Sequence, residues 1–110
     1  MERLVKGDAV VLPFPFSDLS AAKKRPAVIL SVLDGEDVIL CQVTSHARHD
    51  RYSISLTATD FKAGRLTLAS FIRPNRLFTA DRSLILYKIG SLKESKIREV
   101  EEKLIKLIRQ

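Results

Sequence analysis

Among the residues of this chain that could do chemistry is an arginine placed directly before a proline. Arg25 precedes Pro26, and an apolar run follows. Because a residue before proline is held in extended geometry, the Arg25 backbone has a set direction as it enters a predicted strand. Its guanidinium offers planar, permanently charged donors that suit a phosphate. An ordinary exposed arginine fits the same pattern, so both interpretations stay open.

Two hydroxyl residues and a histidine follow a second apolar run. Thr44 and Ser45 end this run, where a hydroxyl either reaches a phosphate oxygen or hydrogen-bonds to the backbone of a turn. His46 and His49 come next, and imidazole titrates near neutral pH, so both are candidates for acid–base chemistry as well as ordinary exposed loop residues. No Cys or carboxylate joins them with the spacing of metal ligands. No zinc site is therefore predicted.

The charge of the chain favours a polyanionic partner. Nineteen Lys and Arg residues against thirteen Asp and Glu residues give a formal charge of +6 and a pI near 9.8. Many of the basic residues fall in three segments that are predicted to be loops, namely Lys23 to Arg25, Arg48 to Arg51, and Arg73 with Arg76. Phe14 and Phe16 lie before the first of these segments and are either stacking platforms for unpaired bases or core residues.

Three β-branched apolar stretches, 9–12, 27–33 and 38–44, predict strands packed deep in a small sheet or barrel. Asp34-Gly35 lies between the second and the third stretch. This dipeptide is typical of a tight antiparallel hairpin, because glycine tolerates positive φ. The hairpin would place Arg25 and Thr44 near the same end of adjacent strands.

The second half of the chain predicts further strands and a terminal helix. Stretches 53–56 and 66–68 alternate polar and apolar residues, and 84–89 is another apolar run. Gly90-Ser91 is expected to open the helix, since Ser91 and Glu94 have the spacing of a capping box. The apolar stripe of this helix is Ile97, Val100, Leu104 and Leu107 or Ile108. The predicted fold is mainly β with a C-terminal helix, arranged as an SH3-like barrel, and the basic residues of the helix are interpreted as a solvated face.

The size and composition of the chain fit one globular domain, residues 1–110. Its hydrophobic content of 45% is too high for a disordered protein, and its apolar runs are far shorter than the ~20 residues of a membrane span. The N-terminal sequence lacks the apolar region of a secretory signal, and the single cysteine cannot form an internal disulfide. A cytoplasmic protein is expected. Cys41 lies in an apolar run and is predicted to be a buried hydrophobe without chemistry.

The order of these motifs closely resembles the MazF/PemK-like toxins of type II toxin–antitoxin systems. The resemblance rests on Gly7-Asp8, a loop, Arg25-Pro26, an apolar strand and Thr44-Ser45. It implies a homodimer with a CcdB/MazF-type barrel that cleaves single-stranded mRNA at short sequences, without metal or cofactor, and so inhibits translation and growth. In this family the ribose 2′-hydroxyl attacks the adjacent phosphate. An acidic, partly disordered antitoxin is the implied protein partner.

The resemblance also implies roles for particular residues. Arg25 and Thr44 fall on the catalytic pair of the family. The implied RNA-binding residues are Ser17, Ser45, His46, Arg48 and Arg73. The chain departs from the family where an Asp-Gln pair often follows the arginine, because Pro74-Asn75 stands there and Asn75 cannot act as a base.

Two other functions remain open from the sequence. A barrel of the CcdB type inhibits DNA gyrase through its terminal helix and does not cut RNA. A barrel without catalysis would bind RNA or a peptide only. The presence of Arg25 with the Thr44-Ser45 pair favours the nuclease over both alternatives.

Overall fold

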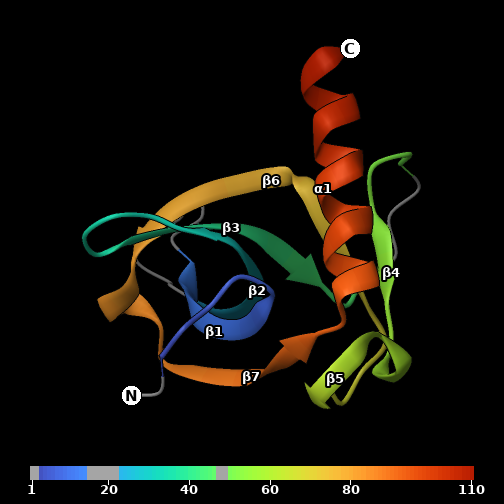
Figure 1. The fold of residues 1–110 in the computed structure, drawn as a ribbon. Coiled ribbons are helices and arrows are strands. Elements are labelled where there is room, and N and C mark those ends of the chain that lie inside the picture. The colour runs from blue at the N-terminus through green and yellow to red at the C-terminus, as the bar shows by residue number, and fades with distance from the viewer. Residues whose placement is uncertain (1–2, 15–22, 47–49) are drawn as a thin grey trace.

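The computed structural model describes residues 3–14, 23–46 and 50–110, which form one antiparallel sheet followed by one helix. The strands are β1 (Asp8–Phe14), β2 (Lys23–Val32), β3 (Asp37–Thr44), β4 (Ile54–Leu56), β5 (Phe61–Gly64), β6 (Ser70–Asp81) and β7 (Tyr87–Leu92). The helix is α1 (Glu94–Arg109), and the 3-10 turns η1 (Ala58–Asp60) and η2 (Arg82–Leu84) precede β5 and β7. The strand order is β4-β6-β3-β2-β1-β7-β5, and Figure 1 shows the sheet curled into a half-barrel with α1 rising from one side. The predicted fold class is confirmed.

The predicted hairpin forms the centre of the sheet. β2 pairs antiparallel with β3, and Gly35 in the turn between them has φ +83°, which explains the need for glycine there. β2 pairs on its other side with β1. Strand β6 pairs along the whole of β3, so the central strands carry neighbours on both sides.

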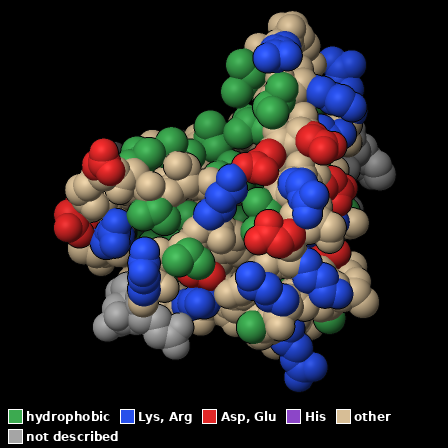
Figure 2. Space-filling view, in the orientation of Figure 1, with side chains coloured by type: hydrophobic (Ala, Val, Ile, Leu, Met, Phe, Trp, Pro, Cys, Tyr) green, Lys and Arg blue, Asp and Glu red, His purple; other side chains and the backbone are tan. Residues whose placement is uncertain are grey.

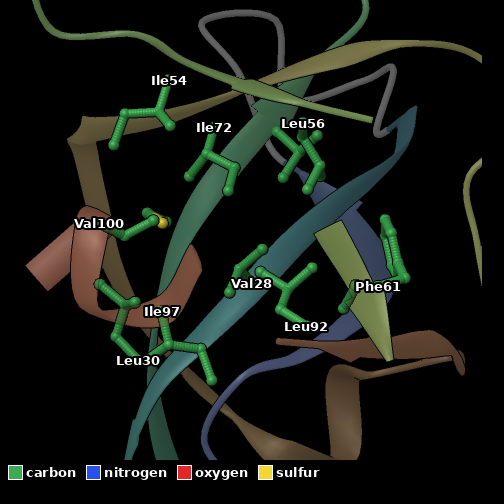
Figure 3. Close-up of a cluster of buried hydrophobic side chains, with 12 residues drawn as sticks. Val28, Leu30, Ile54, Leu56, Phe61, Ile72, Leu92, Ile97 and Val100 are labelled. Carbon is green, nitrogen blue, oxygen red and sulfur yellow. The ribbon is translucent and has the colours of Figure 1, made fainter. Parts of the chain in front are cut away.

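Two hydrophobic clusters cover opposite faces of these central strands. One contains Val28, Cys41 and Val43 together with Ile97 and Val100 of α1, and Figure 3 shows many of its side chains meeting between the helix and the sheet. The other contains the alternate residues of the same strands, including Ala27, Ile29 and Leu40, with Leu12 of β1. Side chains of successive strand residues point to opposite faces, so a continuous apolar run supplies both clusters.

Cys41 is a buried hydrophobe, as predicted. It lies in β3 and is 0% exposed, and burial raises the pKa of its thiol to about 12. A thiol with so high a pKa stays protonated at neutral pH and is a poor nucleophile.

The prediction of a strand at 66–68 is wrong. The strand of this region is β5, which ends at Gly64 and pairs with β7, where Gly64 lies opposite Gly90. A side chain at Gly64 would place its Cβ 2.2 Å from the carbonyl oxygen of Ile89, so the absence of side chains lets the two strands approach. Leu68 instead is 65% exposed.

The start of α1 also differs from the prediction. Ser91 is not the N-cap, because it lies in β7 and its hydroxyl donates to Oδ1 of Asp8 at 3.0 Å. Lys93 is the N-cap residue. Asp8 is fully buried, accepts a hydrogen bond from the backbone N–H of Val5 at 2.8 Å and lies 3.4 Å from Nζ of Lys88. The carboxylate therefore ties the start of β1 to β7.

The predicted apolar stripe anchors the first half of α1. Ile97 and Val100 are buried and Leu104 packs against the same cluster, whereas Ile108 is 68% exposed. Lys96 reinforces this contact, since its Nζ donates to the carbonyl oxygen of Ser55 at 3.0 Å and lies 3.6 Å from Asp60.

Candidate active site

Arg25 and Thr44 lie near the same end of neighbouring strands, each two residues beyond the last pair of the β2–β3 ladder, as the hairpin predicted. The β2–β3 ladder ends at the pair Ala27–Gln42. The same register, continued by two residues on each strand, would bring Arg25 opposite Thr44. β2 begins at Lys23, so Arg25 lies within the strand rather than at its entrance, and there it pairs with Leu12 of β1.

Pro26 lies where the β2–β3 ladder stops. It pairs in register with Val11 of β1, and the first recorded pair between β2 and β3 is one residue further on. Proline has no N–H to donate, so it is suited to a position where a strand loses one of its neighbours. The sheet therefore opens between β2 and β3 at the point where Arg25 and Thr44 are located.

Strand register also places Arg73 on the same face of the sheet. Arg73 pairs with Gln42, and Thr44 pairs with Phe71 two residues away on β6. Directly opposed residues of an antiparallel pair project to the same side, and so do residues two apart on one strand. Arg25, Gln42, Thr44 and Arg73 thus share the face opposite to Val43 and Ile72. Two of the predicted basic loops, those of Arg25 and Arg73, are strands in the structure.

The hydroxyl oxygen of Thr44 accepts a hydrogen bond within a turn, and its O–H group can still donate one. Oγ1 of Thr44 accepts a hydrogen bond from the backbone N–H of His46 at 3.2 Å. A hydroxyl can accept and donate at once, so this turn contact leaves the O–H available as a donor. Thr44 is only 4% exposed, and Arg25 is half-buried. The geometry is therefore compatible with both roles that the sequence left open for Thr44, a hydrogen bond to the backbone of a turn and a hydrogen bond to a phosphate oxygen.

Arg73 is buried beside a carboxylate that the sequence reasoning missed. Its side chain is 11% exposed, and its guanidinium lies 3.8 Å from Oδ2 of Asp50. Oδ1 of Asp50 accepts hydrogen bonds from the backbone N–H groups of Tyr52 and Ser53, at 3.0 and 2.8 Å. These two bonds, with a smaller contribution from Arg73, hold the pKa of Asp50 below its usual range. An aspartate that accepts hydrogen bonds from the backbone two and three residues later forms an Asx turn, and Asp50 could have been recognised in the sequence as a candidate for such a turn.

The remaining predicted residues are placed as follows. Ser45 and His46 are exposed and follow β3 directly. Asn75 is exposed in β6. Ser17 and Arg48, together with Phe16 and His49, lie outside the described residues.

A groove of about 520 Å³ lies beside Gln42 on the same side of β3. It is lined by residues of β1, β3, β6 and η2, namely Leu12, Pro13, Phe14, Gln42, Asn75 to Ala80, and Leu84. Gln42 is 8% exposed and was not among the predicted site residues. Its amide offers both donors and an acceptor next to the basic residues, which suits recognition of a base edge. Phe14 contributes to the core as well, stacking edge-on against Phe78 at 4.6 Å between ring centroids.

Within the described residues, no three His, Cys, Asp or Glu side chains gather as they would around a metal ion. The same part of the chain contains no helix long and apolar enough to span a membrane. The site instead offers two arginines and a hydroxyl donor at the open end of two strands. Such donors suit an anion that gains charge during a reaction.

A curled antiparallel sheet with one C-terminal helix and an arginine–hydroxyl cluster defines a small β-barrel-like protein with a candidate anion site. Residues 6–108 match the family of PemK-like, MazF-like toxins of type II toxin–antitoxin systems. The chain belongs to this family. No curated protein matches the chain in sequence.

Solved structures share its fold over almost the whole length. An endoribonuclease in complex with its cognate antitoxin, from a Mycobacterial species, has a TM-score of 0.75 at 14% identity, with 96% of this chain and 95% of that chain covered. MazF in form I from Deinococcus radiodurans has a TM-score of 0.74 at 24% identity, with 96% of each chain covered. The MazE–MazF complex in form III from the same organism has a TM-score of 0.74 at 23% identity, with 96% and 95% covered.

Proposed function

We propose that this protein is a sequence-specific endoribonuclease toxin that cuts single-stranded mRNA without a metal ion and thereby inhibits translation and growth. Membership of the PemK-like and MazF-like toxins supports this function. The observation that carries it is the strand register around Gln42. Arg25 and Thr44 each lie two residues beyond the pair Ala27–Gln42, and Arg73 lies opposite Gln42 on the same face. Similar folds include an endoribonuclease from a Mycobacterial species.

The proposed reaction uses the RNA's own nucleophile. The ribose 2′-oxygen bonds to the adjacent phosphorus and loses its proton, while the bond from phosphorus to the 5′-oxygen breaks and that oxygen takes up a proton. The products are a cyclic phosphate and a free 5′-hydroxyl. Negative charge increases on the non-bridging oxygens of phosphorus in the transition state, where the Arg25 guanidinium and the Thr44 hydroxyl act as donors.

The other site residues are proposed to hold the RNA. Arg73 contacts a neighbouring phosphate, and Ser45 and His46 contact the nucleotides next to the cut, since both are exposed directly after Thr44. Ser17 and Arg48 are proposed RNA contacts from the resemblance alone.

The test is cleavage of a long single-stranded RNA in the presence of EDTA, with the cut ends mapped. Arg25→Ala and Thr44→Ala are each expected to lower kcat by about 10²–10³-fold, because each removes one donor aimed at the developing charge. Lys62→Ala, a change of an exposed lysine in β5, is the control for net charge and is expected to cut as the wild type does. Cuts at a short recurring sequence that are lost only in the two site variants would support the proposal.

Two results would replace the proposal with an alternative. Intact RNA in EDTA together with inhibition of DNA gyrase would make the protein a CcdB-like inhibitor. Intact RNA that binds tightly, with gyrase unaffected, would make it an RNA-binding barrel without catalysis.

We also propose that the protein is a cytoplasmic homodimer controlled by an acidic antitoxin. The formal charge of +6 favours an acidic partner. The Mycobacterial endoribonuclease was solved in complex with its cognate antitoxin, and MazF from Deinococcus radiodurans was solved as a MazE–MazF complex. Co-purification of the toxin with the product of the adjacent gene tests the antitoxin.

A further inference from the structure

A small basic pocket lies between the C-terminal half of α1 and the chain that leads into β4. Figure 1 shows these two segments side by side. The pocket has a volume of about 160 Å³ and is lined by Arg51, Tyr52, Lys103, Lys106, Leu107 and Gln110. Three of these described residues are cations and none is a carboxylate. The lining therefore favours an anion.

Hydrogen bonds from α1 hold the two walls of the pocket together. Nζ of Lys103 donates to the carbonyl oxygen of Arg51 at 3.1 Å. Nε2 of Gln110 donates to the hydroxyl of Tyr52 at 3.3 Å. Both bonds join residues more than fifty positions apart in the sequence, so the pocket is formed by the fold and is ready before a ligand binds.

The pocket also contains an aromatic surface. Cζ of Arg51 lies 5.5 Å from the centroid of the Tyr52 ring, and Tyr52 is half-buried. Unpaired bases of RNA stack on tyrosine rings and on arginine planes, whereas lysines beside them neutralise the phosphates. The combination of ring, guanidinium and lysines matches one nucleotide of single-stranded RNA better than it matches a simple anion.

The pocket continues the candidate active site along the chain. Asp50 contacts Arg73 of the site at 3.8 Å, and the next residue, Arg51, lines the pocket. The Cα atoms of adjacent residues are ~3.8 Å apart, so the two sites are neighbours. A strand of RNA held at Arg73 therefore needs to cross only this short segment to reach α1.

The pocket is also separate from the exposed apolar part of the helix. Residues three or four apart share a helix face, which puts Lys103, Lys106 and Gln110 on one side of α1. Ile105 and Ile108 lie on the opposite side, where they are 51% and 68% exposed. A partner that covers the two isoleucines leaves the pocket open.

We infer that this pocket is a second RNA subsite, which binds a nucleotide flanking the cut through Arg51, Tyr52, Lys103 and Lys106. The inference rests on the proposed endoribonuclease function and names a further contact of its substrate. It differs from the interpretation of the helix lysines as only a solvated face, because two of them line this pocket.

The experiment compares two lengths of RNA and two charge-matched variants. The RNAs carry 2′-O-methyl groups so that they bind without being cut, and one is just long enough for the site while the other has flanking nucleotides on both sides. Lys103→Gln with Lys106→Gln removes two of the three cations of the pocket and leaves Arg51. Lys62→Gln with Lys93→Gln removes the same charge from exposed positions in β5 and at the start of α1. Affinity is measured by fluorescence anisotropy against salt concentration, and thermal unfolding confirms that both variants fold.

The pocket variant is expected to bind the longer RNA roughly tenfold more weakly at physiological salt. It is also expected to lower the slope of log K against log salt by about 0.7, since the pocket takes one nucleotide and each phosphate contact with a single strand contributes ~0.7. Binding of the short RNA is expected to stay within about twofold of wild type, because only the flanking nucleotide reaches the pocket. The control variant should match the wild type for both lengths.

Other outcomes separate this inference from the proposed function. Equal losses in the pocket variant and the control, or no loss in either, would overturn the subsite. Unchanged RNA binding with a loss of antitoxin binding would show that a protein occupies the pocket, which also overturns it. Binding is measured without cleavage, so the two proposals can fail separately. A loss of affinity for the longer RNA only would support the subsite, even if the wild type does not cut RNA. Failure to cut RNA would contradict only the proposed nuclease.

Discussion

The Asp50 carboxylate accepts two backbone hydrogen bonds and also lies beside the Arg73 guanidinium. All of these contacts favour its ionised form, and they lower its pKa from the usual 3.8. A group with a lowered folded-state pKa adds stability above its unfolded-state pKa and loses that contribution as the pH falls through the folded-state value. The ionised Asp50 carboxylate therefore stabilises the turn that precedes β4, and this stabilisation is lost in acid.

Asp50→Asn is predicted to lower the free energy of unfolding at neutral pH but not in acid. The amide oxygen still accepts the bonds from Tyr52 and Ser53, and the charge beside Arg73 is lost. Urea unfolding at pH values from about 7 to about 2 should show a difference between wild type and variant that is constant above pH ~4 and vanishes below the folded-state pKa. A difference that grows in acid would contradict the direction of the pKa shift.

The residues of the site show what the sequence could and could not predict. The prediction that Arg25 and Thr44 lie near the same end of adjacent strands is confirmed, because a short connection of four residues makes β2 and β3 an antiparallel pair. The nearness of Asp50 to Arg73 depends on how a loop returns to the edge of the sheet, and no local pattern encodes that path. The same holds for Arg51 and Lys103, whose contact joins distant segments.

At the scale of elements, glycine decides how closely β5 and β7 approach. Gly64 has φ +70°, and a Cβ there would meet the backbone of β7 at 2.2 Å. Gly35 also has positive φ, at +83°, but nothing lies within 4 Å of its Cβ position. A substitution at Gly35 therefore measures only the cost of positive φ, whereas a substitution at Gly64 measures that cost and the cost of a steric clash.

Gly35→Ala is predicted to destabilise the fold by about 1 kcal/mol, the cost of a left-handed residue with a side chain. Gly64→Ala adds a clash with backbone that cannot move aside, and the total is expected to be ~3 kcal/mol or more. Denaturant unfolding of the two variants measures this difference. Equal losses in both would show that β7 shifts to accept the methyl group.

Element boundaries were harder to predict than the elements themselves. The alternating residues at 66–68 favoured a strand, but the glycine pair of β5 and β7 fixed the pairing elsewhere. Ser91 fits a capping box by spacing, but the buried Asp8 holds it in β7, so the helix starts later. In each case a contact between distant residues outweighed a local preference.

At the scale of the whole molecule, hydrophobic side chains remain exposed on one side. Figure 2 shows them over the upper part of α1 and along β6. Ile105, Ile108 and Leu77 are 51%, 68% and 43% exposed. A contiguous apolar surface of this kind is typical of an interface between proteins.

Ile105→Glu with Ile108→Glu is predicted to convert the proposed homodimer into a monomer, because two buried charges without partners cost several kcal/mol. Sedimentation velocity measures the change. Lys62→Glu with Lys93→Glu introduces two glutamates away from this surface and should leave the dimer intact. A double isoleucine variant that stays dimeric would place the interface on another surface.

The single cysteine, Cys41, can report when β3 becomes exposed to solvent, because its thiol is buried in that strand. β3 carries both Cys41 and Thr44, so any event that lets a reagent reach the sulfur must first lift or expose the strand that holds the site. With a pKa of about 12, the thiol also needs to reach water before it can ionise. Timed alkylation of the unmodified chain should therefore follow the equilibrium between closed and open β3 under native conditions, and RNA bound at the site is expected to slow it.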